Sequence, residues 1–232
     1  MPTHTASSTA ERQACAAEAL RIYRRYQLEF VEGLNLCPWA ERARLDGHVA
    51  ERVLLHPTDF ITDSLQVIDE LTPQSQIEIG LIIFAGLRCS RATFERQVAA
   101  LIDADRDRST LTSPAFACAA FHPDATAVTS HAERLVPFLR RSPDPTIQLV
   151  RISALDRVRR GFSEGTHFFD PAQINLQQPP PKREQPLRER IAKANLQTIE
   201  KVGLAHAEAI LQSIFEDRDA SYARLGCWRH PE

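Results

Sequence analysis

The segment Ile77–Phe84 (IEIGLIIF) constrains the fold most strongly, because it begins by alternating apolar and polar residues and ends as a continuous apolar run. A strand has this pattern when helices cover both faces of its sheet. Apolar residues at helical spacing flank it on either side, ending at Leu71 before Pro73 and beginning again after Ser90. The segment therefore predicts the central strand of an α/β fold.

Three further strands are predicted, and segments with helical spacing separate all four. The three are His48–Leu55, Ala115–Phe121 and Thr146–Ile152. The chain opens with one predicted helix, from about Glu11 to Leu34. Strands that alternate with helices need crossover connections, which build parallel or mixed sheets between layers of helix. We therefore expect an α/β fold with a mixed or largely parallel sheet of about four strands flanked by helices, and a C-terminal helical appendage.

The order of these elements predicts three parts. We expect an α/β domain over 11–160, a Pro-rich covering loop or linker over 161–185, and a C-terminal helical segment over 186–232 packed on the first domain. Pro171 and the run Pro179–Pro181 exclude regular helix from the middle part. With 232 residues, the chain is long enough to bury a core without a disulfide or a metal.

The composition is that of an ordinary globular protein and excludes several classes. The hydrophobic fraction of 43%, the charged fraction of 25% and the net charge of −2 exclude a disordered chain, a collagen-like chain and a coiled coil. The near-neutral charge also argues against nucleic acid as a partner, because binding a phosphate backbone needs a clustered cationic face. The polar N-terminus and the lack of a long apolar run argue against export and against a membrane.

The five cysteines are odd in number and widely spaced, and they form no CxxC or CxxH pair. This pattern argues against a disulfide framework and against a structural zinc site. We therefore expect reduced thiols and a cytoplasmic location.

Cys37 is the first candidate for chemistry. It precedes Pro38, at a predicted helix start where unpaired backbone N–H groups and the helix dipole favour the thiolate. A thiolate there could act as a nucleophile or as a metal ligand, and the Cys-Pro pair leaves haem contact open as well. The alternative is a small apolar side chain packed in a tight turn, since free cysteines are among the most buried residues. The sequence therefore leaves the cofactor unknown.

His122 directly follows the predicted strand Ala115–Phe121. Ligands collect beyond the carboxyl ends of strands in open parallel sheets, so this imidazole is placed to act as an acid, a base or a metal ligand. Asp124, two residues on, either orients the imidazole or is an ordinary turn residue. The structural alternative is that Pro123 fixes the turn and His122 caps backbone carbonyls.

An anion site is predicted around Arg141. The two prolines that follow it restrict the backbone and hold Arg141 and Ser142 in a set orientation before the next strand. A preorganised guanidinium recognises carboxylate or phosphate, and Arg151 at the far end of that strand adds a second one. The span 133–160 holds seven arginines against three acidic residues, which supports an anion site. The alternative is a solvated arginine face with a structural ion pair.

Three segments together resemble a known family. They are Gly33–Ala40 (GLNLCPWA), Ala120–Asp124 (AFHPD) and Arg141–Arg151 (RSPDPTIQLVR). In this order and at these separations they are similar to an uncharacterised bacterial family, domain of unknown function 1415 (DUF1415). The resemblance covers about Phe30 to Arg160, with a weaker echo over Leu187–Leu204. It implies a fold and a site, and Asn35 of the first segment joins the candidate ligand-binding residues.

Two functions fit these observations. In the first, the protein is a cytoplasmic enzyme acting on a small anionic metabolite. Arg141 and Arg151 hold the anionic group, His122 is the acid/base, and Cys37 is the nucleophile or a metal ligand. In the second, the protein is a non-catalytic binding or assembly module whose C-terminal helices dock a partner or form a homodimer. This second function predicts an exposed apolar stripe, made of Ile199, Val202, Ile210 and Phe215.

Overall fold

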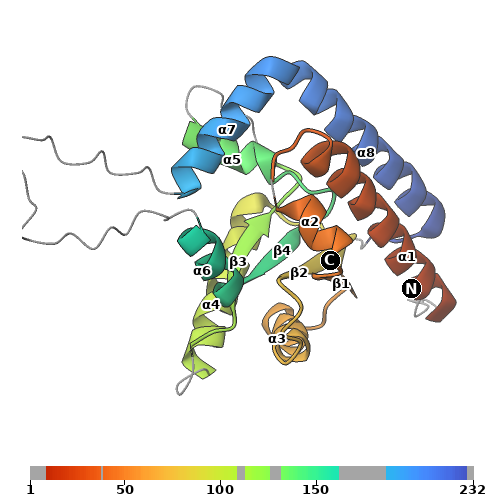
Figure 1. Ribbon diagram of the computed structural model, residues 1–232. Helices are drawn as coiled ribbons and strands as arrows, with labels where there is room; N and C mark the ends of the chain where they lie inside the picture. Colours follow the sequence, from red (N-terminus) through yellow and green to blue (C-terminus); the bar gives the residue numbers. More distant parts are fainter. Residues whose placement is uncertain (1–8, 38, 109–112, 126–131, 162–186, 229–232) are drawn as a thin grey trace, which may run out of the picture.

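A computed structural model describes residues 9–37, 39–108, 113–125, 132–161 and 187–228. At its centre is a four-stranded sheet with helices on both faces (Figure 1). The strands are β1 (Val49–Leu55), β2 (Ile79–Ala85), β3 (Phe116–Phe121) and β4 (Thr146–Arg151). Their order in the sheet is β1-β2-β4-β3; β1 pairs parallel with β2, and β4 runs antiparallel to both of its neighbours. The predicted α/β fold with a mixed sheet is confirmed.

Helices connect the strands and cover the sheet. They are α1 (Thr9–Arg25), η1 (Tyr26–Glu32), α2 (Ala40–Leu45), α3 (Phe60–Leu71), α4 (Arg91–Arg108), α5 (Ala132–Leu139), α6 (Ile152–Gly161), α7 (Leu187–Val202) and α8 (Leu204–Leu225). The predicted opening helix is α-helical only to Arg25 and continues as a π-helix, η1. Asp59 caps α3, because its carboxylate accepts a backbone N–H three residues on at 2.6 Å. Pro38 and, beyond Gly161, the segment predicted as a Pro-rich loop or linker lie outside the described residues.

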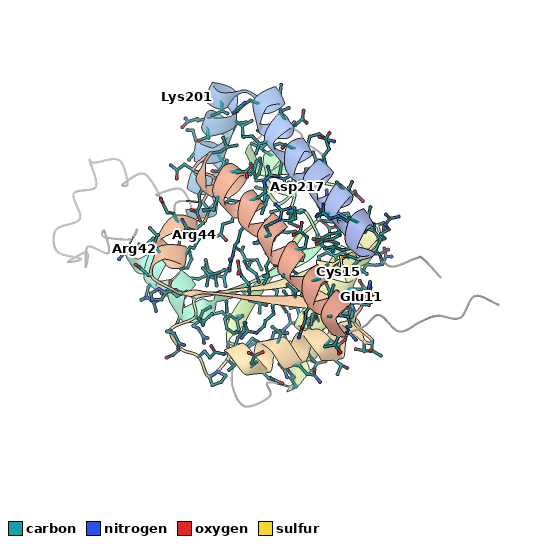
Figure 2. The ribbon with its side chains drawn as sticks, turned by 90° about the vertical axis from the view of Figure 1, so that its right-hand side faces the viewer. Glu11, Cys15, Arg42, Arg44, Lys201 and Asp217 are labelled. Atoms are coloured by element: carbon teal, nitrogen blue, oxygen red, sulfur yellow. A yellow bond between two sulfur atoms is a disulfide. The ribbon has the colours of Figure 1, made fainter. Side chains whose placement is uncertain are left out.

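The alternating side chains of β2 divide the core into two layers. Ile79, Leu81 and Ile83 belong to a cluster with residues of α1, η1, α5, α7 and α8. Ile82 and Phe84 belong to a second cluster with α3 and α4. Successive residues of a strand point to opposite faces, so a strand that is apolar throughout serves both layers. Figure 2 shows the sheet edge-on, with α1 above it and α3 below.

The C-terminal helices contribute to the first of these layers. Ile199 and Phe215 are 2% and 8% exposed, and Val202 and Ile210 pack partly buried against the same cluster. The prediction of an exposed apolar stripe formed by these four residues is therefore wrong, because α7 and α8 turn them towards the sheet. Among the described helices, none is both long and apolar enough to cross a lipid bilayer.

A disulfide joins the two ends of the described chain. Cys15 on α1 is bonded to Cys227, which follows α8 and lies 212 residues later. The two helices run side by side (Figure 1). Asp217 of α8 forms ion pairs with Arg21 and Arg25 of α1. The prediction of reduced thiols is therefore wrong for this pair, because the fold brings together two cysteines that no short spacing connects. The other three cysteines are free.

Candidate functional site

Three segments meet at one end of the sheet. Because β2 and β3 both run antiparallel to β4, the carboxyl ends of β2 and β3 lie beside the start of β4. The Phe84 backbone N–H donates to the Pro145 carbonyl at 2.9 Å across this end. His122, the loop 86–89 and the segment 141–145 are therefore neighbours, at the edge where ligands collect in open α/β sheets.

His122 is buried, with 3% of its surface exposed. Its Nδ1 accepts the Asp124 backbone N–H at 3.2 Å, so the neutral imidazole carries its proton on Nε2. The ring also hydrogen-bonds to the backbone of Cys89, and Nε2 lies 4.0 Å from the Cys89 thiol. Burial lowers the pKa of His122 below its usual value, although the Asp124 carboxylate, 3.8 Å from Nδ1, opposes this. The imidazole is therefore largely uncharged at neutral pH.

A small recess opens beside this imidazole. It has a volume of about 70 Å³ and is lined by Arg91, Glu95, Ala120, His122, Ala125, Val136, Pro137 and Arg140; we call it the His122 recess. Arg91 Nε donates to Glu95 Oε1 at 2.7 Å, and the Arg140 guanidinium lies 5.6 Å from the centre of the Phe121 ring. Two arginines and one glutamate line the recess, and the Asp124 carboxylate lies beside it, 3.8 Å from Nδ1 of His122.

Arg91, Arg140 and Cys89 of this region were not selected from the sequence, and of these Cys89 lies against the ring of His122. It is a free, half-buried thiol in the loop between β2 and α4. Burial raises the pKa of the Cys89 thiol, and the negative charge of Asp124 raises it further, so the sulfur is protonated at neutral pH. Its position shortly after a predicted strand is the signal that could have selected it, since the same argument selected His122.

Arg141 lies next to the turn that follows His122. Its Nε donates to the Pro123 carbonyl at 3.0 Å, and its guanidinium lies over the rings of Phe138 and Phe215. The guanidinium therefore braces the His122-Pro123-Asp124 turn from the side of α8.

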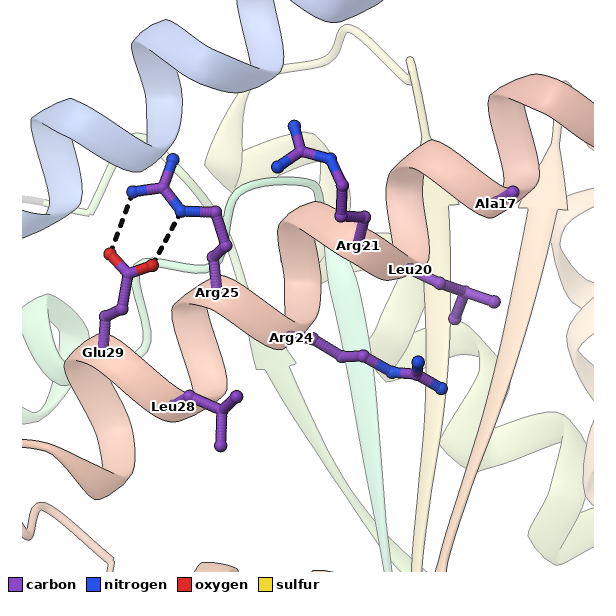
Figure 3. A pocket seen from close by; sticks show the side chains of 7 residues that line it. All are labelled: Ala17, Leu20, Arg21, Arg24, Arg25, Leu28 and Glu29. Atoms are coloured by element: carbon purple, nitrogen blue, oxygen red, sulfur yellow. Dashed lines mark hydrogen bonds and ion pairs between the residues drawn. The ribbon is translucent and has the colours of Figure 1, made fainter.

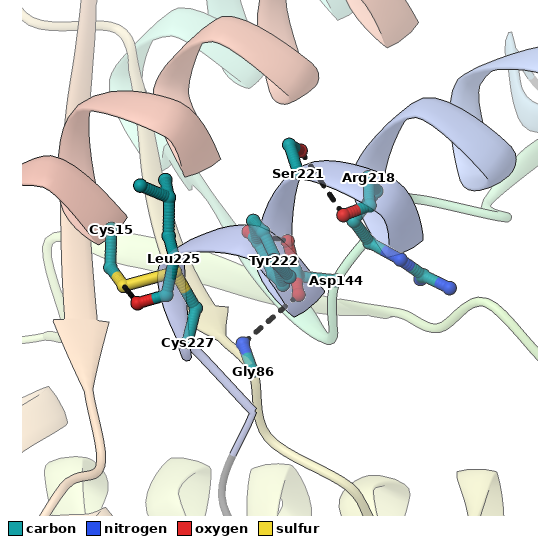
Figure 4. Close-up of a disulfide and its surroundings, with 8 residues drawn as sticks. All are labelled: Cys15, Gly86, Asp144, Arg218, Ser221, Tyr222, Leu225 and Cys227. Atoms are coloured by element: carbon teal, nitrogen blue, oxygen red, sulfur yellow. Dashed lines mark hydrogen bonds between the residues drawn. A yellow bond between two sulfur atoms is a disulfide. The ribbon is translucent and has the colours of Figure 1, made fainter.

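Ser142 and Asp144 form a buried link between the sheet and α8. The Ser142 hydroxyl donates to the Asp144 carbonyl at 2.5 Å. The Asp144 carboxylate accepts the Tyr222 hydroxyl at 2.7 Å. It also accepts the Gly86 backbone N–H at 3.2 Å, as Figure 4 shows. Burial raises the pKa of Asp144, and the Tyr222 hydroxyl and the Arg218 charge oppose this. The hydroxyl predicted to bind a ligand is thus bonded to backbone.

Arg151 lies at the opposite end of the sheet from His122. The Arg151 guanidinium donates to backbone carbonyls around the C-terminus of α3 and the start of β2. These bonds use four of its five N–H donors. Its partners are the carbonyls of Leu71, Thr72, Gln74 and Ile77, at 2.6 to 3.3 Å. The charge lies 4.5 Å from the centre of the Phe116 ring. These contacts tie α3 to the sheet.

Cys37 and Asn35 do not line the His122 recess. Cys37 is a free, half-buried thiol, and Asn35 is exposed in the turn after η1 with a φ of +51°. Trp39 Nε1 donates to Glu78 Oε2 at 3.1 Å, which fixes the following helix near the start of β2 and so at the other end of the sheet. The six-residue α2 that follows is too short to concentrate charge at its start.

A larger hollow of about 520 Å³ lies along the outer face of α1 and η1 (Figure 3). It is lined by Ala17, Leu20, Arg21, Arg24, Arg25, Leu28 and Glu29. Among the described residues no thiol or imidazole lines this hollow, and Arg25 and Glu29 are paired with each other. In the part of the chain that the structure covers, no three metal-ligating side chains lie close enough to hold an ion. Of the two hollows, the His122 recess is the one lined by an imidazole, and it is therefore the candidate site.

The fold and the site define an α/β protein with a histidine and two arginines around a small recess at the end of a mixed sheet. The family model described as protein of unknown function (DUF1415) matches residues 20–175, and the chain belongs to that family. The resemblance seen in the sequence is thereby confirmed. A search of curated proteins and a search of solved structures found no match.

Proposed function

We propose that the protein is an enzyme that binds a small anionic metabolite in the His122 recess, through Arg91 and Arg140, and uses His122 as its acid/base. The observation that carries this proposal is the meeting of a buried, uncharged imidazole with two arginines in one recess. Titratable groups with shifted pKa values in a recess are typical of functional sites.

Size and charge favour a carboxylate head group. A volume of about 70 Å³ exceeds the ~10–15 Å³ that holds one water and is far below the ~300 Å³ of a pocket that encloses a drug-sized ligand. The guanidinium groups of Arg91 and Arg140, which both line the recess, can donate to a carboxylate. The recess therefore suits the head group of a ligand whose remainder extends into solvent.

His122 can accept a proton at Nδ1 when the Asp124 backbone N–H that donates to its single lone pair moves away. A proton taken up there faces the carboxylate of Asp124, which stabilises the resulting imidazolium from 3.8 Å. Asp124 is therefore proposed as the partner of the imidazole, which is the first of the two roles considered for it in the sequence. Arg141 is proposed as a positioning residue, since its contact with Pro123 holds the turn between His122 and Asp124.

The remaining candidates have no contact with the ligand in this proposal. Ser142 and Arg151 are bonded to backbone, and Cys37 and Asn35 do not line the recess. A cytoplasmic location is also proposed, and the three free thiols support it.

The test is a calorimetric titration of the full chain with formate, acetate, glycolate and pyruvate. We expect at least one of them to bind, and Arg91→Ala and Arg140→Ala to weaken its binding by about tenfold or more, because each removes a charge-assisted contact. Arg96→Ala is the matched control, since Arg96 is exposed on the same helix and does not line the recess. Unchanged binding in both recess variants, or no binding of any of the four acids, overturns the proposal.

The acid/base role is tested separately, on whatever larger carboxylate proves to be turned over. His122→Gln is expected to lower kcat while leaving KM largely unchanged, because Gln keeps the polar contacts but cannot take up a proton. A variant with unchanged kcat rules out His122 as the acid/base.

A further inference from the structure

The Cys15–Cys227 disulfide is the single closed pair in a chain whose three other cysteines are free. Proteins that use disulfides only for stability in an oxidising compartment usually have most of their cysteines paired. Isolated disulfides in the cytosol are more often transient or redox-sensing. The disulfide also fixes the position of the residues that follow α8 (Figure 4).

That chain end packs directly on the loop after β2. An added Cβ at Gly86, whose φ is +70°, would lie 2.2 Å from the Cys227 carbonyl oxygen, so only a glycine allows this approach. The Trp228 ring lies 4.4 Å from the Arg88 guanidinium and packs edge-on against Tyr222 at 5.1 Å. Residues 226–228, which we call the C-terminal latch, therefore hold Gly86 and Arg88 in place.

The loop under the latch leads directly to the His122 recess. The Gly86 N–H donates to Asp144, in the segment that precedes β4. Cys89, three residues after Gly86, contacts His122, and Arg91 begins α4 and lines the recess. Three residues along the backbone therefore separate Gly86, under the latch, from Cys89, which contacts His122.

We propose that Cys15 and Cys227 are a reversible redox pair, and that the state of their disulfide sets the order of the loop 86–89. Hydrogen peroxide oxidises one thiol to a sulfenic acid with release of water. The second thiol then attacks that sulfur and releases a second water as the disulfide forms. A dithiol reductant reverses the bond by two exchange steps, becoming a cyclic disulfide while both cysteines regain their protons.

Burial makes the closed form persistent. Cys15 and Cys227 are 5% and 1% exposed, so a reductant reaches the sulfurs only when the chain end after Gly226 opens. Once the bond is broken, the latch is held only by its noncovalent contacts. We therefore expect slow reduction, followed by faster opening of the loop beneath it.

The first measurement counts thiols in the intact full-length protein. Maleimide labelling after denaturation is expected to give three thiols in peroxide-treated protein, five after prolonged treatment with dithiothreitol, and three again after reoxidation. Cys118→Ser is the matched control, because Cys118 is a free thiol outside the pair and its loss lowers each count by one. A disulfide that never forms, or that dithiothreitol cannot break in the native protein, overturns the proposal.

The second measurement follows hydrogen exchange at Gly86 and Leu87, whose amides donate to Asp144 and to the Phe84 carbonyl. Reduction is expected to speed their exchange about tenfold or more, and Cys227→Ser is expected to match the reduced protein with or without dithiothreitol. Exchange that is equal in oxidised and reduced wild-type protein overturns the proposal. No ligand is used, so the result does not depend on the function proposed above.

Discussion

At the scale of single residues, the partners of a side chain decide its role more than its type does. Arg141 and Arg151 flank the same strand, and both were candidates for binding an anion. Arg141 donates a hydrogen bond to the turn after His122, whereas Arg151 donates to backbone carbonyls at the C-terminus of α3. Carbonyls at a helix end lack partners within the helix, so a guanidinium there stabilises the fold.

Arg151→Ala is expected to lower the free energy of unfolding by about 1–3 kcal/mol, because several charge-assisted bonds to carbonyls are lost at a partly exposed position. Urea denaturation measures this, with Arg96→Ala as the exposed control. Unchanged stability together with weaker carboxylate binding would show instead that Arg151 binds the ligand.

His122 makes stability depend on pH. Burial holds the folded-state pKa of His122 below the value of about 6.5 in the unfolded chain, so the unfolded chain takes up the proton more readily. The stability that neutral His122 contributes is present above about pH 6.5 and is lost as the pH falls towards the folded-state pKa. Wild type is therefore expected to lose more stability than His122→Gln between pH 7.5 and 5.5 in urea denaturation. Equal losses would refute this.

At the scale of elements, the exit of β2 is closely packed against the residues that follow α8. Gly86 and Gly47 both have positive φ, +70° and +72°. At Gly86 an added Cβ meets the Cys227 carbonyl oxygen, whereas at Gly47 nothing lies within 4 Å. Substituting alanine at each of the two glycines therefore distinguishes the cost of backbone strain from the cost of a clash with the C-terminal latch.

Gly86→Ala is expected to cost about 2–4 kcal/mol and Gly47→Ala only about 1 kcal/mol, since both variants strain φ but only the first displaces the chain end. The comparison uses urea denaturation of both variants under oxidising conditions. An equal loss of stability in the two variants would mean that the C-terminal latch does not pack closely against Gly86.

The elements themselves were largely predictable from the sequence. The strand around Ile82 had the apolar run of a strand buried on both faces, and α3 had its Pro73 stop. The change from α1 to η1 was not predictable, because a π-helical turn keeps apolar residues near helical spacing. The buried face of α8 was misjudged, since an apolar stripe has the same pattern whether it faces the core or a partner.

At the scale of the whole molecule, the C-terminal helices and the sheet share one core. Leu211 of α8 is fully buried in the cluster that contains Ile83 of β2 and Phe138 of α5. A shared core couples the unfolding of its elements.

Leu211→Ala is expected to lower the free energy of unfolding by about 2–5 kcal/mol and to leave a single transition. Leu45→Ala is the control, since Leu45 is 68% exposed, and it is expected to change stability by less than about 0.5 kcal/mol. Circular dichroism and tryptophan fluorescence should follow one curve. Two separate transitions would show that α7 and α8 form an independent unit.

The site was only partly predictable, because it is a property of the folded molecule. His122 and Arg141 were selected from their places beside predicted strands, and they are neighbours in the structure. Cys89 and Arg91 belong to the same end of the sheet, but only the strand order β1-β2-β4-β3 brings their loop beside His122. The Cys15–Cys227 bond was missed for the same reason, since nothing local links residues 212 positions apart.

The most direct test of the central claim is a titration of ¹⁵N-labelled full-length protein with acetate, followed by amide chemical shifts. The account predicts saturable shifts that are largest at Arg91, His122 and Arg140, around the recess. Shifts centred on the hollow along α1, or none that saturate, would contradict it.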